Sequence, residues 1–180
     1  MWKNFLYTLF ISASFFLIAG CSLDEVLDGV DQILNEESDS AQQIESISEL
    51  KNTDYFKQGA LAHILEGELN KKNQAVGFHY DRLPTKKGEI IPGTATEPND
   101  FGVFEAEVKV NDVAKTSNKG RSSFFPNEWT TQQVVDAINE AYEHRAFISG
   151  NTYEGLTAEG MPIRMYLDNK DLIISAFPVY

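Results

Sequence analysis

The 180-residue sequence has one cysteine, three histidines and few basic side chains for its acidic content. One cysteine excludes intrachain disulfides, Cys₂His₂-type zinc sites and CxxC redox motifs. The formal net charge of −12, from 15 Lys and Arg against 27 Asp and Glu, excludes a continuous basic surface for nucleic-acid phosphates and argues against DNA as a target. Internal repeats and low-complexity composition are also absent, so we expect one folded domain.

The amino terminus has the pattern of a secretory leader. Its apolar run, residues 5–19, is about 15 residues long, whereas a membrane span needs roughly 20. The run ends in Ile18-Ala19-Gly20-Cys21, which resembles the lipobox of bacterial lipoproteins. We therefore expect residues 1–20 to be a lipoprotein signal peptide and Cys21 to be lipidated, which would anchor the protein in a bacterial cell envelope, on the outer face of the cytoplasmic membrane or on the outer membrane. The alternatives are an ordinary signal peptide with an unrelated cysteine and a transmembrane anchor.

Most of the acidity lies just after this leader. Residues 22–50 carry nine acidic side chains and no Lys or Arg, whereas residues 51–180 hold 14 basic and 18 acidic side chains. Apolar residues between Leu23 and Leu34 recur at a spacing that permits a short amphipathic helix. We expect residues 21–56 to be an acidic tether and residues 57–180 to be the folded domain.

Apolar periodicity within residues 57–180 predicts an α+β fold. A helical stripe covers residues 58–70, and a second helix begins at the capping-box pair Thr130 and Gln133 and runs to about His144. Alternating apolar residues predict strands at 75–81, 101–110, 163–167 and 172–177, the last two joined as a hairpin. The order α, β, β, α, β, β favours a compact domain with a mostly antiparallel sheet and helices packed on it.

Two histidines fall on the polar faces of these elements. His63 lies nearly opposite the centre of its helical stripe, and His79 alternates away from the apolar side chains of its strand. Because imidazole changes charge near neutral pH, the pair is a candidate general acid and base, with ordinary surface histidines as the alternative. The third histidine, His144, is expected to be a cation at a helix carboxyl end.

A metal site is the weaker interpretation of the same histidines. It would need a third ligand such as Asp81 or Glu66, and the sequence gives no spacing typical of such a ligand set. We therefore predict no metal site.

Four separated motifs resemble the bacterial EndoU endoribonuclease domain, over residues 57–180. In chain order they are His63–Glu68 (HILEGE), Gly77–His79 (GFH), Lys119–Pro126 (KGRSSFFP) and Ile174–Pro178 (ISAFP). The resemblance implies an α+β fold related in mechanism to pancreatic-type ribonucleases. It also implies RNA cleavage on the 3′ side of uridine-like bases, leaving a 2′,3′-cyclic phosphate. Bacterial members are often secreted toxins, so an immunity protein is a candidate partner alongside the RNA substrate.

The resemblance also implies which residues carry out the reaction. His63 and His79 match the two catalytic histidines, in an order that the sequence leaves open. Lys119 matches the lysine that neutralises charge growing on the phosphorane, with Lys115 and Lys109 as alternatives in a loop that is hard to align. No cofactor is implied as a requirement, and stimulation by Mn²⁺ is left open.

Three further residues match substrate-binding positions. Ser123 matches the residue that contacts the uracil edge, and Ser175 matches the short polar residue of the last strand. Phe177 stands where the family commonly has a tyrosine that stacks on ribose or base, so stacking is kept and the hydroxyl is lost, with Tyr180 or Tyr166 as alternative sources. On the last strand we expect Ile173, Ser175 and Phe177 to share the cleft face, and Ile174 and Ala176 to face the core.

Two other functions remain as alternatives to a membrane-tethered ribonuclease. One is a lipoprotein that keeps this scaffold as a binding module with little or no turnover, which the Phe177 substitution favours. The other is an unrelated lipoprotein of envelope assembly.

Overall fold

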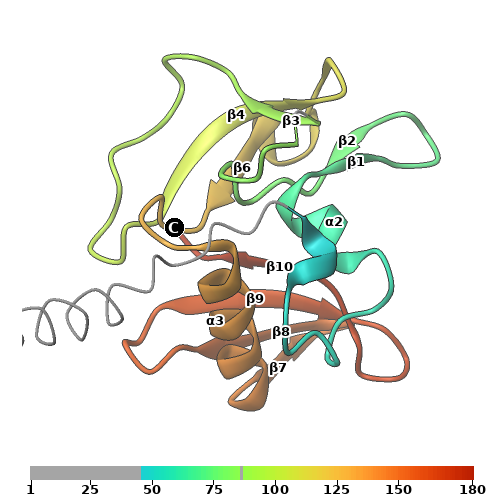
Figure 1. The fold of residues 1–180 in the computed structure, drawn as a ribbon, viewed down its shortest axis with the longest axis vertical. Coiled ribbons are helices and arrows are strands. Elements are labelled where there is room, and N and C mark those ends of the chain that lie inside the picture. Colours follow the sequence, from blue (N-terminus) through green and yellow to red (C-terminus); the bar gives the residue numbers. More distant parts are fainter. Residues whose placement is uncertain (1–45, 86) are drawn as a thin grey trace, which may run out of the picture. The chain divides into compact units, whose positions relative to one another are not determined.

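The computed structural model describes residues 46–85 and 87–180, and these have the predicted α+β fold with antiparallel sheets (Figure 1). The predicted signal peptide, the lipidation site Cys21 and the helix of the tether lie outside these residues. No helix of residues 46–85 and 87–180 is long and apolar enough to cross a membrane.

One sheet is formed by the carboxyl-terminal part of the chain. It has the order β10-β9-β8-β7, with all neighbours antiparallel. The strands are β7 (Ala146–Ser149), β8 (Thr152–Leu156), β9 (Pro162–Leu167) and β10 (Ile173–Pro178). Helix α3 (Thr131–Glu143) crosses one face of this sheet (Figure 1). Its close approach requires Gly155, because a Cβ there would overlap the Ala141 carbonyl group.

A second sheet and several short elements come from the preceding part of the chain. Strand β4 (Phe104–Val110) is central, and it pairs antiparallel with β3 (Gly88–Ile90), β5 (Val113–Ala114) and β6 (Arg121–Phe124). The short elements are 3₁₀ helices η1 (Ile47–Glu49) and η2 (Ser117–Gly120), helix α2 (Ala60–Leu65), and the paired strands β1 (Glu68–Leu69) and β2 (Ala75–Val76).

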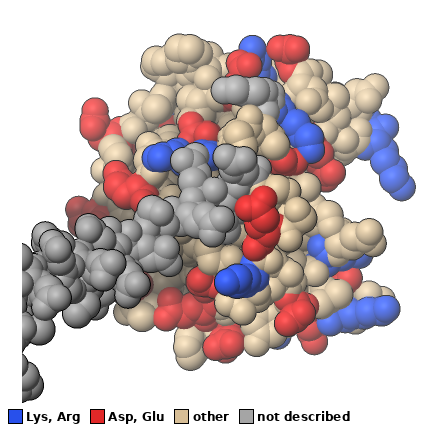
Figure 2. Space-filling model, in the orientation of Figure 1, with Lys and Arg blue, Asp and Glu red and all other residues tan. Residues whose placement is uncertain are grey.

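The buried apolar side chains form two separate clusters. The larger cluster lies between α2, α3 and the carboxyl-terminal sheet, and it includes Ile64, Ile138 and Met165. The smaller cluster lies on the β4 sheet and includes Val108 and Phe124. Two packed cores therefore support the region where α2, β6 and β10 meet. Acidic and basic side chains are interspersed over the face shown in Figure 2.

The second predicted helix and the final hairpin are confirmed. The Thr130 hydroxyl accepts the Gln133 amide at 3.2 Å, and the Thr130 amide donates to Gln133 Oε1 at 2.7 Å, so the predicted capping box starts α3. The predicted strand at 101–110 is present as β4. The hairpin is β9 and β10, with a β-bulge between Ile173 and Ser175 that the sequence pattern did not indicate.

Two predicted elements are wrong in their extent. The first helix ends at Leu65 rather than near Asn70, because Gly67 adopts a left-handed φ of 75° and the chain continues into β1. The predicted strand at 75–81 ends at Val76, because Gly77 and Phe78 have φ values of 73° and 63°. Two consecutive left-handed residues turn the chain out of the sheet, so strict alternation fails beyond this point.

Candidate active site

A cleft of about 770 Å³ lies where α2, β2, β6, β9 and β10 come together. Five of the six predicted site residues line it: His63, His79, Ser123, Ser175 and Phe177. The sixth, Lys119, does not line it, whereas Lys115 does. The fold therefore brings together residues that are up to 114 positions apart in the sequence.

His63 projects from the short helix α2 into the cleft, as its position off the apolar stripe predicted. Its Nδ1 lies 3.0 Å from Glu68 Oε1, and its side chain is 19% exposed. Because a carboxylate accepts, Nδ1 carries a hydrogen and Nε2 remains for the substrate. Glu68, at the start of β1, was not singled out by the sequence reasoning, although it stands only five residues after His63.

His79 is buried, in contrast to the predicted position on an exposed strand face. It is 6% exposed, and its Nδ1 lies 2.8 Å from the Ser123 carbonyl oxygen. A carbonyl only accepts, so His79 donates from Nδ1 and keeps a free lone pair on Nε2. Its neighbours Phe78 and Tyr80 are buried in the smaller and the larger core respectively.

The environment of His79 strongly favours its neutral form. Burial, together with the nearby charges of Lys115 and His63, lowers the pKa of His79 from 6.5 to about 3, against the opposing effect of the hydrogen bond to Ser123. A neutral imidazole with an available Nε2 is the form that a general base requires.

Backbone hydrogen bonds fix the two histidines relative to each other. The Phe78 amide donates to the His63 carbonyl at 3.0 Å, and the His79 amide donates to the Ile64 carbonyl at 2.7 Å. This approach needs glycine at position 77, since a Cβ there would overlap the His63 carbonyl oxygen. The segment that ends β2 is thus joined directly to helix α2.

Lys115 places an ammonium group in the cleft. Its Nζ donates to Ser122 Oγ at 2.7 Å and to the Gly77 carbonyl at 3.3 Å, and the Ser122 hydroxyl donates to the same carbonyl at 3.1 Å. Burial lowers the pKa of Lys115 to about 8. Ser122 itself is fully buried, so this network holds the ammonium group in place.

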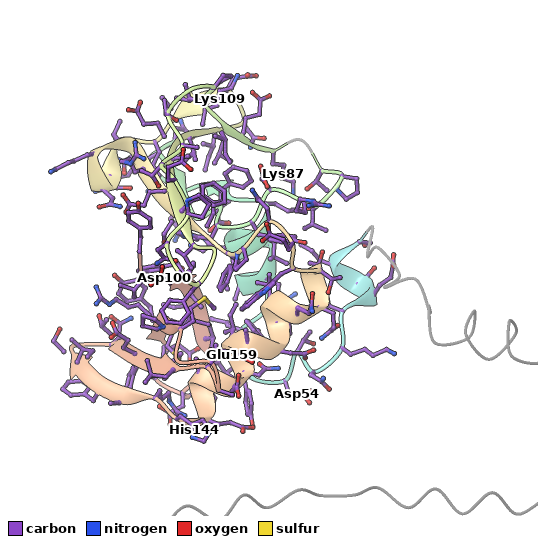
Figure 3. The ribbon with its side chains drawn as sticks, turned by 90° about the vertical axis from the view of Figure 1, so that its left-hand side faces the viewer. Asp54, Lys87, Asp100, Lys109, His144 and Glu159 are labelled. Atoms are coloured by element: carbon purple, nitrogen blue, oxygen red, sulfur yellow. The ribbon has the colours of Figure 1, made fainter. Side chains whose placement is uncertain are left out.

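The two other candidate lysines lie elsewhere. Lys119 is exposed within η2, where its φ is 55°. Lys109 is ion-paired with Glu89 at 2.8 Å and with Asp112 at 3.6 Å, and Figure 3 shows it at the outer end of the β4 sheet. The geometry therefore favours Lys115, one of the two alternatives, over Lys119.

The last strand presents more of its side chains to the cleft than alternation predicted. Ser175 and Phe177 line the cleft and Ala176 is buried in the core, as expected. Ile174 also lines the cleft and Ile173 is buried in the core, contrary to the prediction for both. The bulge between Ile173 and Ser175 explains the difference, because an extra residue shifts the two-residue alternation.

Phe177 stacks on a catalytic candidate within the protein. Its ring centroid lies 5.2 Å from that of His79, with 21° between the planes. Tyr166 lies next to it, with centroids 6.1 Å apart and planes at 44°. The Tyr180 hydroxyl donates to the Glu97 carbonyl at 3.1 Å, so of the two alternative tyrosines Tyr166 is the one beside Phe177.

The remaining polar candidates do not form a metal site. Among residues 46–85 and 87–180, no group of three or more His, Cys, Asp or Glu side chains is placed to hold a metal ion. The carboxylate of Glu66 instead forms an ion pair with the ammonium group of Lys87. His144 is the exposed C-cap residue of α3, distant from the β4 sheet in Figure 3.

Comparison with known proteins identifies relatives of this domain. The profile of the family described as "Bacterial EndoU nuclease" matches residues 57–180. A protein named "Toxin" from Bacillus cereus is 48% identical over 134 residues, which are 74% of this chain and 25% of that protein. The chain thus spans about a quarter of the length of this curated relative. No solved structure gives a significant match.

Proposed function

Because the chain belongs to the bacterial EndoU nuclease family, we propose that it is an endoribonuclease that cuts RNA on the 3′ side of uridine-like bases. The reaction would be a transesterification by the ribose 2′-hydroxyl that leaves a 2′,3′-cyclic phosphate. The proposal depends on one observation: two histidines and a lysine line the same cleft. Each imidazole is fixed by a hydrogen bond at Nδ1, and the lysine is fixed by a hydrogen bond to the buried Ser122. The family supports a nuclease, and the substrate follows from the resemblance of the motifs.

We assign His79 as the general base. Its neutral state and free Nε2 suit it to take the proton from the 2′-hydroxyl, and the hydrogen bond to the Ser123 carbonyl orients the ring. Burial and the lysine charge both oppose prior protonation of this ring. The base is therefore available throughout the physiological pH range.

We assign His63 as the general acid. The Glu68 carboxylate accepts from Nδ1 and orients the ring, so that an Nε2–H directed into the cleft would protonate the leaving 5′ oxygen. The two histidines differ in the group that each Nδ1 contacts: a neutral carbonyl for His79 and an anionic carboxylate for His63. This difference is what separates their roles.

We assign Lys115 the role of stabilising the negative charge that develops on the phosphate during cleavage. An ammonium group held in a half-buried position stabilises the negative charge that grows on the phosphorane oxygens. The nucleophile belongs to the substrate itself, so we propose that cleavage needs no cofactor, and that EDTA leaves its rate unchanged.

We further propose that the nuclease acts as a toxin and that an immunity protein is its partner. The support is that the Bacillus cereus relative, of which this chain covers a quarter, is named as a toxin. Lipid anchoring through Cys21 would hold this activity at the envelope of the producing cell.

Cleavage of a fluorescent oligoribonucleotide with one uridine, by the purified full chain, tests the proposal. His63→Ala and His79→Ala should each lose about 10² to 10⁴ in rate. Lys115→Ala should also lose activity, whereas Lys119→Ala, in the same loop, is the matched control and should cut like the parent. Melting curves verify that each variant is folded.

A different pattern would reject these assignments. A folded His63→Ala or His79→Ala protein that keeps more than about a tenth of the parental rate would remove that histidine from the mechanism. Loss of activity in Lys119→Ala with none in Lys115→Ala would restore the original sequence prediction. A parent that binds the oligonucleotide and never cuts it would favour the binding-module alternative, which Phe177 in place of tyrosine already suggests.

A further inference from the structure

We propose that the open face of strands β9 and β10 beside the cleft binds a nucleotide beyond the two that flank the cleaved linkage, with Tyr166 stacking on its base and Arg164 binding its phosphate. The inference rests on the proposed RNA substrate. It adds an outer nucleotide subsite to the cleft, formed by two residues that none of the four motifs includes.

The pairing of the strands places these side chains in one row. Tyr166 pairs with Ser175 and Arg164 pairs with Phe177. Residues two apart on a strand share a face, so all four lie on the face opposite the buried Ile163, Met165 and Leu167. All four line the cleft, so this face is continuous with the site of the two histidines.

The aromatic side chains divide into two roles. Phe177 stacks on His79 at 5.2 Å, so part of its ring surface is already used inside the protein. The Tyr166 ring is tilted by 44° against that of Phe177 and is only half-buried. A nucleobase that lies away from the two histidines can therefore stack on it. Base stacking on such a ring gives affinity without requiring a particular base.

Arg164 is held in a fixed orientation but remains open to solvent. Its Nε and Nη2 lie 3.1 and 2.7 Å from Glu154 Oε2, and its side chain is 40% exposed. One carboxylate oxygen thus holds one edge of the guanidinium group, and the Nη1 amino group remains for a phosphate.

The other arginine of the cleft is already committed to the fold. Arg121 donates from Nη2 to the Thr94 carbonyl at 3.0 Å and to the Glu105 carbonyl at 2.9 Å, and its Nε is paired with the Glu105 carboxylate. Lys115 is held by Ser122 and Gly77 beside the histidines. Arg164 is therefore the cleft cation best placed to take a phosphate other than the one being cut.

Binding and cleavage by the full chain test this subsite separately. The ligands are a uridine-containing dinucleotide and oligonucleotides extended by two nucleotides on either side, each also made with 2′-deoxyuridine so that it cannot be cut. Binding is measured by fluorescence anisotropy. Tyr166→Ala and Arg164→Ala should each weaken binding about 10-fold to 100-fold for the oligonucleotide that is extended on the side of this subsite. Both variants should cut the dinucleotide like the parent. Tyr166→Phe keeps the ring and should bind normally.

Two further measurements separate phosphate binding from a structural role of the arginine. Loss of one phosphate contact should reduce the slope of log Kd against log salt by about 0.7 in Arg164→Ala. Arg82→Ala is the matched control, since Arg82 is exposed, lies outside the cleft lining and donates to the Asn127 carbonyl. Glu154→Gln removes a negative charge next to the phosphate and should tighten binding several-fold, which loss of a structural ion pair would not do.

The two proposals fail in different ways. Parental binding by Tyr166→Ala and Arg164→Ala, or equal losses on dinucleotide and extended substrates, would overturn the subsite even if the enzyme is active. Absence of RNA binding by the parent would overturn it as well. Binding that depends on Arg164 and Tyr166 without any cleavage would instead retain the subsite and reject the ribonuclease.

Discussion

The buried imidazole of His79 links stability to pH. Its pKa in the folded protein is about 3, against 6.5 for an ordinary histidine, so between these values the unfolded chain binds a proton that the folded chain does not. Its contribution to stability is therefore complete above about pH 6.5 and is lost as the pH falls toward 3. The low pKa of His79 can therefore be tested through the stability of the protein, without any substrate.

We expect His79→Asn to reduce this pH dependence. An asparagine amide can replace Nδ1 as donor to the Ser123 carbonyl but takes up no proton. Between pH 7 and pH 4.5 the parent should lose about 2 kcal/mol more of its free energy of unfolding than the variant. Urea unfolding at the two pH values measures this difference. Equal losses in parent and variant would show that His79 is not buried in neutral form.

Phe177 is expected to support His79 as well as the substrate. Removing the stacked ring admits water to the imidazole, and because burial is the main cause of its low pKa, that pKa should rise toward 6.5. Phe177→Ala should therefore lower kcat and move the acid limb of the rate profile to higher pH, whereas Phe177→Tyr should keep the acid limb. Rates measured from pH 4 to 8 on variants with verified melting curves give the answer. An unmoved acid limb in Phe177→Ala would contradict this role.

The choice of the proposed catalytic lysine could not be made from the sequence. His63 could be placed from helical periodicity because only its own turn of helix matters. Lys115 and Lys119 lie in one loop of similar composition, and the choice between them depends on a hydrogen bond to Ser122 on β6 and on the left-handed turn at Asn118 and Lys119. Such contacts leave no periodic signal in the sequence.

At the scale of elements, predictions held where one local signal was strong. The capping box and the apolar stripe gave α3, and alternation gave β4 and the β9–β10 hairpin. The predicted strand at 75–81 ends early because Phe78 adopts a left-handed conformation, in which its amide donates to the His63 carbonyl of α2. Strands β7 and β8 were missed, since β7 is exposed at the edge of the sheet and shows no alternation of burial.

The contact between α2 and the end of β2 can be tested with paired glycine variants. Gly77→Ala should destabilise the fold by several kcal/mol and remove activity, because the new Cβ overlaps the His63 carbonyl. Gly93→Ala is the control: its φ of 78° is close to the 73° of Gly77, but nothing lies within 4 Å of the new Cβ. It should cost only about 1 kcal/mol, the price of a left-handed alanine. Similar losses in both variants would show that strain alone, not the contact, makes glycine necessary.

At the scale of the whole molecule, we propose that the chain is a lipid-anchored envelope protein. Residues 18–21 have the lipobox pattern, and the strongly acidic residues 22–50 separate this anchor from a domain with nearly balanced charge. Two or more acyl chains on one residue suffice for stable membrane attachment. The anchor, the tether and the nuclease would then be consecutive along the chain.

Phase partitioning in detergent tests the anchor. The parent should enter the detergent phase, and Cys21→Ser should yield unprocessed precursor or soluble protein. The Lys119→Ala protein, altered far along the chain, should partition like the parent. Unchanged processing and partitioning of Cys21→Ser would rule out lipidation at this residue.

The three consecutive residues Phe78, His79 and Tyr80 enter the smaller core, the cleft and the larger core in turn. His79, the proposed base, is thus flanked in the chain by two residues whose side chains are buried in different cores. Neither core can open by itself without moving His79, so partial unfolding cannot leave a working site behind. The amides of His79 and Phe125, which donate to the Ile64 and His79 carbonyls, should then exchange with solvent deuterium only when the whole domain opens. Enzyme activity would accordingly report on the cooperativity of the entire domain, and a released, partly unfolded chain would be harmless to RNA.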